Sequence, residues 1–160
     1  MNIVLHQPEI PHNTGAIGRT CLVTGAKLHL IRPYGFHLDE KSLKRAGMDY
    51  WHKLNVQEYD SFQHFIDITM GENAPPIGGV SRPSFYLVET GSSKTYADVN
   101  YKPHDYIIFG SETTGLPAHI LSQYRDNIVS IPMIGDSRSL NLSVAVGIVL
   151  YEALRQNGFS

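Results

Sequence analysis

Short apolar segments alternate with helical patterns along this chain of 160 residues. Residues 3–5 and 106–109 are apolar at successive positions, which is typical of strands buried on both faces. Such alternation indicates an α/β fold with a mostly parallel sheet flanked by helices. The pattern predicts strands at Asn2–His6, Lys27–Ile31, Leu54–Glu58, Ser84–Glu89, Tyr106–Gly110 and Asn127–Ile131, and helices at Thr14–Thr24, Glu40–Ala46, Ser61–Met70, Pro117–Gln123 and Leu142–Asn157.

The last predicted helix is apolar at nearly every position from residue 144 to residue 151. A helix that is apolar all round is buried on both sides, and one chain of this size covers only one of them. We therefore expect a homodimer through this C-terminal helix, with Val146 and Tyr151 in the interface. Gly147 would suit a point where two backbones approach closely, since a glycine in mid-helix is otherwise unfavourable.

Length and composition limit the class of protein. A chain of this length fits a single domain over residues 1–160. No apolar run has the length of a membrane span, and the N-terminal segment reads as a strand and a turn, not as a signal peptide. Cys21 is the only cysteine, so no internal disulfide can form. We expect a cytoplasmic protein without membrane association.

Charge is distributed unevenly. The net charge is -2, but residues 1–56 carry seven Lys and Arg against four Asp and Glu, a net +3. A basic N-terminal third allows a polyanionic partner without requiring one. Lys41, Lys44 and Arg45 share one face of a predicted helix, which is either a solvated face or a grip on phosphate.

Three chemically distinctive loops follow predicted strands, and ligands of parallel sheets bind beyond the carboxyl ends of the strands. The first loop leads into a helix with Asn13 as a candidate N-cap and Gly15 in the first turn. Arg19, one turn further, would point back over the helix N-terminus, where free amides bind anions. A phosphate site and a capped helix with an exposed arginine are equally compatible with this spacing.

The second loop, FGSETTGLP at residues 109–117, lacks the lysine of a Walker A loop and the spacing of the dinucleotide fingerprint. Glu112 would suit a ribose hydroxyl or an amine, although the pattern slightly favours a turn shaped by glycines. The third loop, SRSLNLS at residues 137–143, offers hydroxyls, an amide and a guanidinium to a neutral or phosphate-bearing ligand. It could also be a helix cap that uses Ser139 or Asn141.

Other candidate residues are less specific. The eight histidines have no metal-ligand spacing, so we expect no metal. Cys21 fits a core position better than a nucleophile. The pair Tyr50 and Trp51 could stack on a base, although tryptophan more often belongs to a core.

In combination, the pattern N-x-G-x-x-x-R at 13–19, the loop at 109–117 and IPM…DSRSLNLSVAV at 131–146 resemble the three motifs of the SPOUT class of RNA ribose methyltransferases. The opening NIVLHQPEIPHNTGAIGRTC, the segment KRAGMDYW at 44–51 and the lack of an RNA-binding extension resemble the YibK-like branch. That branch comprises tRNA (cytidine/uridine) 2′-O-methyltransferases that modify the wobble nucleotide. The resemblance covers essentially the whole chain, and the main departure from it is the Pro/Gly-rich loop at 71–83, which is longer than usual and lies outside the motifs.

The resemblance implies a C-terminal deep trefoil knot, a homodimer and S-adenosylmethionine as the cofactor. It implies an enzyme that transfers a methyl group to the 2′-hydroxyl of the wobble nucleotide of tRNA. The alternatives are a non-catalytic module that binds cofactor or RNA, and a methyltransferase of ribosomal RNA. The expected site residues are Val88, Gly110, Ile131, Met133, Ser139 and Leu140 for the cofactor, Arg19, Arg138, Asn141 and Ser143 for catalysis, and Asn13, Lys41, Lys44 and Arg45 for RNA.

Overall fold

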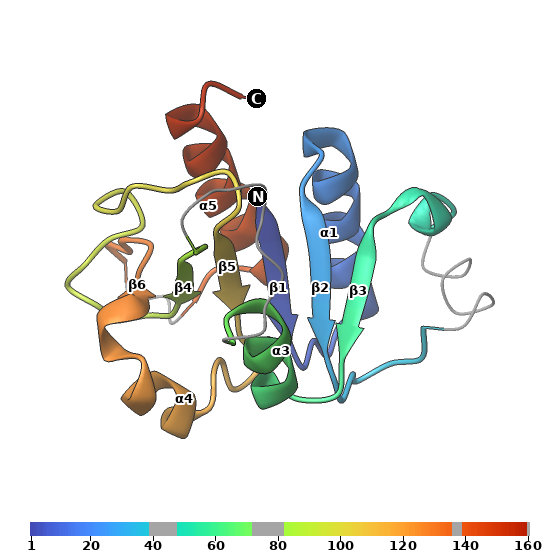
Figure 1. The fold of residues 1–160 in the computed structure, drawn as a ribbon, viewed down its shortest axis with the longest axis horizontal. Helices are drawn as coiled ribbons and strands as arrows, with labels where there is room; N and C mark the ends of the chain where they lie inside the picture. Colours follow the sequence, from blue (N-terminus) through green and yellow to red (C-terminus); the bar gives the residue numbers. More distant parts are fainter. Residues whose placement is uncertain (39–47, 72–81, 136–138, 160) are drawn as a thin grey trace.

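The computed structural model describes residues 1–38, 48–71, 82–135 and 139–159 (Figure 1). Its centre is a sheet of six strands in the order β3-β2-β1-β5-β4-β6, and every neighbouring pair is parallel. The predicted parallel sheet is therefore confirmed. The strands are β1 (Asn2–His6), β2 (Lys27–Ile31), β3 (Val56–Tyr59), β4 (Phe85–Val88), β5 (Tyr106–Phe109) and β6 (Ile128–Val129).

Helices cover both faces of the sheet (Figure 1). Helices α1 (Pro11–Thr24) and α5 (Leu142–Gln156) pack together against one face, while α3 (Phe62–Thr69) and α4 (Ala118–Gln123) cover the other. Two short 3₁₀ helices, η1 (Trp51–Lys53) and η2 (Arg125–Asn127), lie in connections. Strand β1 serves both layers because successive side chains of a strand point to opposite faces. Ile3 and Leu5 pack with α1 and α5, and Val4 packs with α3 and α4.

The predicted element boundaries hold with a few instructive exceptions. Helix α1 begins at Pro11, three residues before the predicted start, because proline is well suited to the first helical position. Asn13 is therefore inside the first turn, and its predicted role as N-cap is wrong. Strand β6 ends at Val129, although Ser130 continues the pairing as an isolated bridge to Thr95. The predicted helix Glu40–Ala46 lies outside the described residues.

Helix α5 has one buried side and one exposed side in the protomer. Val146, Val149 and Leu150 are fully buried in the core. Val144 and Tyr151 are each 50% exposed. The prediction that Val146 belongs to a subunit interface is therefore wrong, because this side chain packs inside its own protomer.

A series of hydrogen-bonded, buried polar side chains crosses three neighbouring strands, from β1 through β2 to β3. The Asn2 side-chain amide donates to the carbonyl oxygens of His104 (2.8 Å) and Asp105 (3.3 Å), so its oxygen must accept from His29 Nε2 at 3.2 Å. His29 Nδ1 then accepts from the Tyr59 hydroxyl at 2.9 Å. Burial lowers the pKa of His29 to about 4, so the neutral ring is the stable form inside the fold.

Two further observations bear on the class of protein. Burial raises the pKa of the Cys21 thiol to about 12, and the side chain is fully buried, in agreement with a core role. Among the helices of the described ranges, none is both long enough and apolar enough to cross a membrane.

Candidate active site

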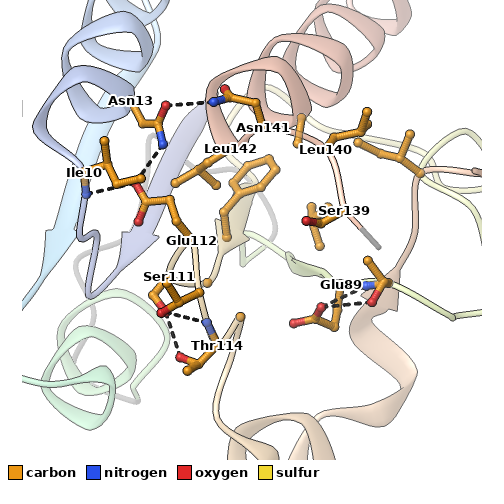
Figure 2. Close-up of a pocket in the computed structure, with 18 of the residues that line it drawn as sticks. Ile10, Asn13, Glu89, Ser111, Glu112, Thr114, Ser139, Leu140, Asn141 and Leu142 are labelled. Carbon is orange, nitrogen blue, oxygen red and sulfur yellow. Dashed lines mark hydrogen bonds between the residues drawn. The ribbon is translucent and has the colours of Figure 1, made fainter. Parts of the chain in front are cut away.

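A cavity of about 510 Å³ opens at the carboxyl edge of the sheet (Figure 2). Its walls come from the residues that follow β1, β4, β5 and β6 and from the segment that leads into α5. Because all six strands are parallel, their carboxyl ends share one edge, and loops distant in sequence meet there. The expectation that the three distinctive loops converge is met by this arrangement.

The loop after β5 is a tight turn that depends on two glycines. Ser111 and Gly115 exchange backbone hydrogen bonds of 3.0 and 3.2 Å, and Gly115 has φ of +66°. A Cβ on Gly110 would lie 2.1 Å from the carbonyl carbon of Gly115. The two ends of the turn therefore touch in a way that only glycine permits, and the interpretation of a turn shaped by glycines is right.

Glu112 projects from this turn towards the beginning of α1 (Figure 2). Its carboxylate accepts hydrogen bonds from the backbone amides of Glu9 (2.8 Å) and Ile10 (3.1 Å) and from Asn13 Nδ2 (3.0 Å). A carboxylate thus accepts from the amides that immediately precede the helix, the region for which a phosphate site was one of the two interpretations. In return, the Glu9 carboxylate accepts from the backbone amide (3.0 Å) and the hydroxyl (2.7 and 2.8 Å) of Thr113. The first two loops are therefore locked to each other from both sides.

Asn141 joins the third loop to this pair. It is the N-cap of α5, and its side-chain oxygen accepts from the Ser143 amide (2.9 Å), the Ser143 hydroxyl (2.6 Å) and the Val144 amide (3.4 Å). Its side-chain nitrogen donates to Asn13 Oδ1 at 3.0 Å (Figure 2). The helix-cap interpretation is right for Asn141, and Ser143, predicted to be catalytic, takes part in the same cap.

All the residues predicted to bind the cofactor line the cavity. Val88 ends β4, Gly110 follows β5, and the remaining members lie after β6 or before α5. The lining residues that were not predicted from the sequence are Ile10, Glu89, Thr90, Phe109, Ser111, Thr113, Thr114, Gly115, Leu142 and Ala145. Most of them are adjacent in sequence to predicted residues, so their position beside those residues was the signal that could have identified them.

Glu89 is the most informative of the missed residues. Its two carboxylate oxygens accept from the backbone amides of Thr90 (2.9 Å) and Leu116 (3.1 Å). It therefore fastens the end of β4 to the turn that follows β5. Glu89 and Glu112 are the only charged side chains among the described residues of the cavity wall, so this wall is acidic.

Arg19 does not line the cavity of its own protomer. Its side chain is exposed, and the guanidinium carbon lies 4.9 Å from the centroid of the Tyr50 ring. The hydroxyl of that ring donates to the carbonyl oxygen of Gly15, one turn towards the helix N-terminus. The predicted orientation of the guanidinium over the helix N-terminus stays a prediction. The remaining predicted residues that lie outside the described ranges are Lys41, Lys44, Arg45 and Arg138.

No group of three His, Cys, Asp or Glu side chains in the described part of the chain could hold a metal ion. The expectation that the protein uses no metal stays a prediction.

The sequence and the fold have close counterparts in known proteins. Residues 1–151 match the SpoU rRNA Methylase family. The tRNA (cytidine(34)-2'-O)-methyltransferase of Saccharophagus degradans is 44% identical over 99% of this chain and 97% of its own length, and the Yersinia pestis protein of the same name is 43% identical over 99% and 95%.

Solved structures agree with these relatives. A structure concerned with 2-OH methylation of C/U34 on tRNA superposes with a TM-score of 0.85 and 38% identity, covering 99% of this chain and 97% of that one. AviRb of Streptomyces viridochromogenes, solved in complex with AdoMet, has a TM-score of 0.82 and 25% identity, covering 98% and 57%. Sequence and architecture thus agree over essentially the whole chain, which belongs to the SpoU methylase family.

Proposed function

We propose that this protein transfers a methyl group from S-adenosylmethionine to the ribose 2′-hydroxyl of the wobble nucleotide of tRNA, a cytidine or a uridine. The observation that carries the proposal is the full-length similarity, at 43% and 44% identity, to two proteins named for that reaction. The family is described by ribosomal RNA methylation, but these relatives are named for tRNA, which favours tRNA over ribosomal RNA.

The cavity residues fit S-adenosylmethionine. Val88, Ile131 and Leu140 offer apolar surface to an adenine ring, and Gly110 of the tight turn lines the same cavity. The acidic wall formed by Glu89 and Glu112 suits a ligand that carries a sulfonium and an ammonium group. When bound, this cofactor supplies an electrophilic methyl group.

The chemistry asks little of the protein beyond alignment. A bond forms between the ribose 2′-oxygen and the methyl carbon while the bond from that carbon to sulfur breaks, so an in-line approach supplies much of the acceleration. The hydroxyl proton must leave in the same reaction. Arg19 remains protonated and cannot accept it. We assign Arg19 to orienting the hydroxyl and an adjacent phosphate, and the phosphate oxygen to receiving the proton.

Asn141 and Ser143 support this arrangement indirectly. Their mutual hydrogen bonds, and the bond from Asn141 to Asn13, fasten the cofactor loops to α1. We therefore propose that they shape the site. Arg138 remains a predicted catalytic residue, and Lys41, Lys44 and Arg45 remain predicted RNA contacts.

A homodimer would complete the site. Val144, Gly147, Ile148 and Tyr151 follow the i, i+3, i+4, i+7 spacing of one outward face of α5. Leu22 and Val23 on the adjacent α1 are also exposed. Apolar residues gathered on neighbouring helices mark an interface, and a second copy of this chain is the proposed cover.

This interface would also explain the position of Arg19. It precedes Leu22 by three residues and Val23 by four, so all three share one face of α1. Arg19 then lies at the margin of the proposed interface, next to the second copy. A dimer would allow an arginine that is remote from its own cavity to act at the neighbouring one.

The C-terminal trefoil knot also remains a proposal. The chain returns from the edge strand β6 to α5 on the central strands. At the end of α5, the Gln156 side chain accepts from the Tyr101 amide (2.9 Å) and Asn157 donates to the Tyr101 carbonyl (3.0 Å). The end of α5 is thus joined by hydrogen bonds to the connection between β4 and β5, a contact that supports the proposed threading. A tRNA substrate further supports a cytoplasmic location.

Methylation of tRNA from cells that lack this gene tests the proposed function. Purified protein with labelled S-adenosylmethionine should modify only the wobble nucleotide, which mapping of 2′-O-methylation identifies. Modification of ribosomal RNA, or of another tRNA position, would contradict the substrate assignment. Cofactor binding without any transfer to RNA would favour the non-catalytic alternative.

A further inference from the structure

Tyr50 holds a specific position between two points of α1. Its ring lies under the guanidinium of Arg19, at 4.9 Å from ring centroid to guanidinium carbon. This distance is typical of a cation–π contact. Its hydroxyl donates a hydrogen bond to the carbonyl oxygen of Gly15. Gly15 lies one turn before Arg19, so the ring is anchored at its far end to the helix that carries the arginine.

The segment around Tyr50 is seated closely against α1. A Cβ on Gly18 would lie 2.9 Å from Leu54 Cδ1 and 3.2 Å from Trp51 Cζ3, and a Cβ on Gly15 would lie 3.0 Å from Met48 Cγ. Because Gly15 and Gly18 have no side chains, residues close to Tyr50 in sequence pack directly against the backbone of α1. This packing fixes the backbone of Tyr50. Trp51 packs against the core, which was the predicted alternative to stacking on a base.

The contact matters because Arg19 is exposed. A long exposed side chain samples many rotamers, and a group that aligns a reacting hydroxyl must be held in one orientation. In the described part of the chain, no ion pair or side-chain hydrogen bond with a carboxylate holds Arg19. Tyr50 is the residue that orients it, through the face of its ring and through a hydrogen bond between its hydroxyl and the guanidinium.

We infer that Tyr50 is a positioning residue for methyl transfer, which acts by holding the guanidinium of Arg19 against its ring. The inference rests on the proposed role of Arg19 in orienting the ribose and phosphate. Tyr50 touches neither the cavity nor the cofactor site. It should therefore affect turnover on tRNA without affecting cofactor affinity.

Two variants of the full-length enzyme separate the ring from the hydroxyl. Tyr50→Phe keeps the aromatic face and loses the hydrogen bonds of the hydroxyl with Gly15 and Arg19, whereas Tyr50→Leu also removes the face. Tyr50→Leu should lower kcat for tRNA by roughly fivefold or more, and Tyr50→Phe should retain most of it. The dissociation constant of S-adenosylmethionine, measured by calorimetry, should stay unchanged in both.

A spectroscopic measurement adds a readout that a purely structural role would not move. The Nε–Hε signal of Arg19, identified by its loss in Arg19→Lys, should carry the ring-current shift of Tyr50. That shift should persist in Tyr50→Phe and vanish in Tyr50→Leu. Tyr34→Leu is a matched control, because Tyr34 lies 5.8 Å from the Arg32 guanidinium in a similar contact outside the site. It should leave kcat and the Arg19 signal unchanged.

The outcomes distinguish the inference from the proposed function. If Arg19→Ala methylates tRNA at the wild-type rate, the role of Arg19 is wrong and the role of Tyr50 falls with it. If Arg19→Ala is impaired while Tyr50→Leu retains the wild-type kcat, only the positioning role is overturned. If Tyr50→Leu lowers kcat, cofactor affinity and the melting temperature together, Tyr50 only stabilises the fold and the positioning role is overturned.

Discussion

The side-chain nitrogen of Asn141 donates a 3.0 Å hydrogen bond to the side-chain oxygen of Asn13, across 128 residues of sequence. Each asparagine uses both ends of its amide. Asn13 donates onward to Glu112, and the oxygen of Asn141 caps α5. The two side-chain amides therefore hold three loops together, and these three loops form part of the cavity wall.

Asn13→Ala should lower the free energy of unfolding by about 1–3 kcal/mol, because it leaves Glu112 and Asn141 without a shared partner. Asn13→Asp should cost more at neutral pH, since it sets a second carboxylate beside Glu112. Urea titration measures both, and calorimetry should reveal weaker cofactor binding. Asn55→Ala is the control, because the Asn55 side chain is exposed and has no hydrogen bond within the described residues. Equal effects of Asn13→Ala and Asn55→Ala would contradict the role of the network.

Substitutions on the exposed face of α5 should dissociate the proposed dimer. Tyr151→Asp and Val144→Asp should yield folded monomers in light scattering after size exclusion, because both side chains are 50% exposed in the protomer. Val146→Asp should instead unfold the protein, since this residue is fully buried. A wild-type protein that is a well-folded, fully active monomer at micromolar concentration would refute the dimer.

Gly147 offers a finer test of the same interface. A Cβ added there meets nothing within 4 Å among the residues that the structure describes. Gly147→Ala should therefore stabilise an isolated helix by about 1 kcal/mol through propensity alone. If two backbones approach at this point, the same change should weaken the dimer, measured as a raised dissociation constant in sedimentation experiments. Stabilisation without any effect on dimerisation would exclude close backbone contact there.

Gly110→Ala should abolish cofactor binding. The added Cβ would fall 2.1 Å from the Gly115 carbonyl carbon and 2.3 Å from the Leu116 nitrogen, so the turn could not close. Calorimetry with S-adenosylmethionine should detect no saturable binding, while circular dichroism should still report the fold. Gly135→Ala is the matched control, since a Cβ there has no neighbour within 4 Å in the described part of the chain. Normal cofactor affinity in Gly110→Ala would show that the turn tolerates rearrangement.

Arg19→Ala should keep cofactor affinity nearly intact, because Arg19 does not line the cavity of its own protomer. Transfer of labelled methyl groups to tRNA should fall strongly. Arg19→Lys should recover little, because an ammonium lacks the planar fork of a guanidinium. Ser139→Trp, in the cavity wall, should by contrast abolish both binding and transfer. Loss of cofactor binding in Arg19→Ala would place Arg19 in the cofactor site instead.

Acid should destabilise the protein through His29. Burial lowers the pKa of His29 to about 4, with smaller effects from Lys27 and the N-terminal amine. The unfolded state binds this proton more readily than the folded state. The contribution of neutral His29 to stability is therefore complete above pH 6.5 and is lost as the pH falls towards 4. The shift corresponds to at most about 3 kcal/mol. Chemical denaturation of His29→Gln should have a flatter pH dependence over this range than wild type. An identical slope would exclude His29 as the cause.

The apolar pattern alone determined the parallel sheet, most of the helices and the edge of the sheet at which a site should lie. These features depend on periodicity within a few residues, and burial of a strand or helix face is written in that local pattern. The motifs added the residues of the cavity wall, because Val88, Gly110 and Ser139 belong to segments that follow or precede regular elements.

Tertiary structure decided how these residues are used. The amides before α1 are held by Glu112, the guanidinium of Arg19 rests on Tyr50, and Val146 packs inward while Val144 faces outward. Sequence periodicity could not predict these relationships, because each depends on groups brought together across loops and layers. A side chain's partner is set by which distant segment the packed sheet places beside it, and that information exists only in the folded chain.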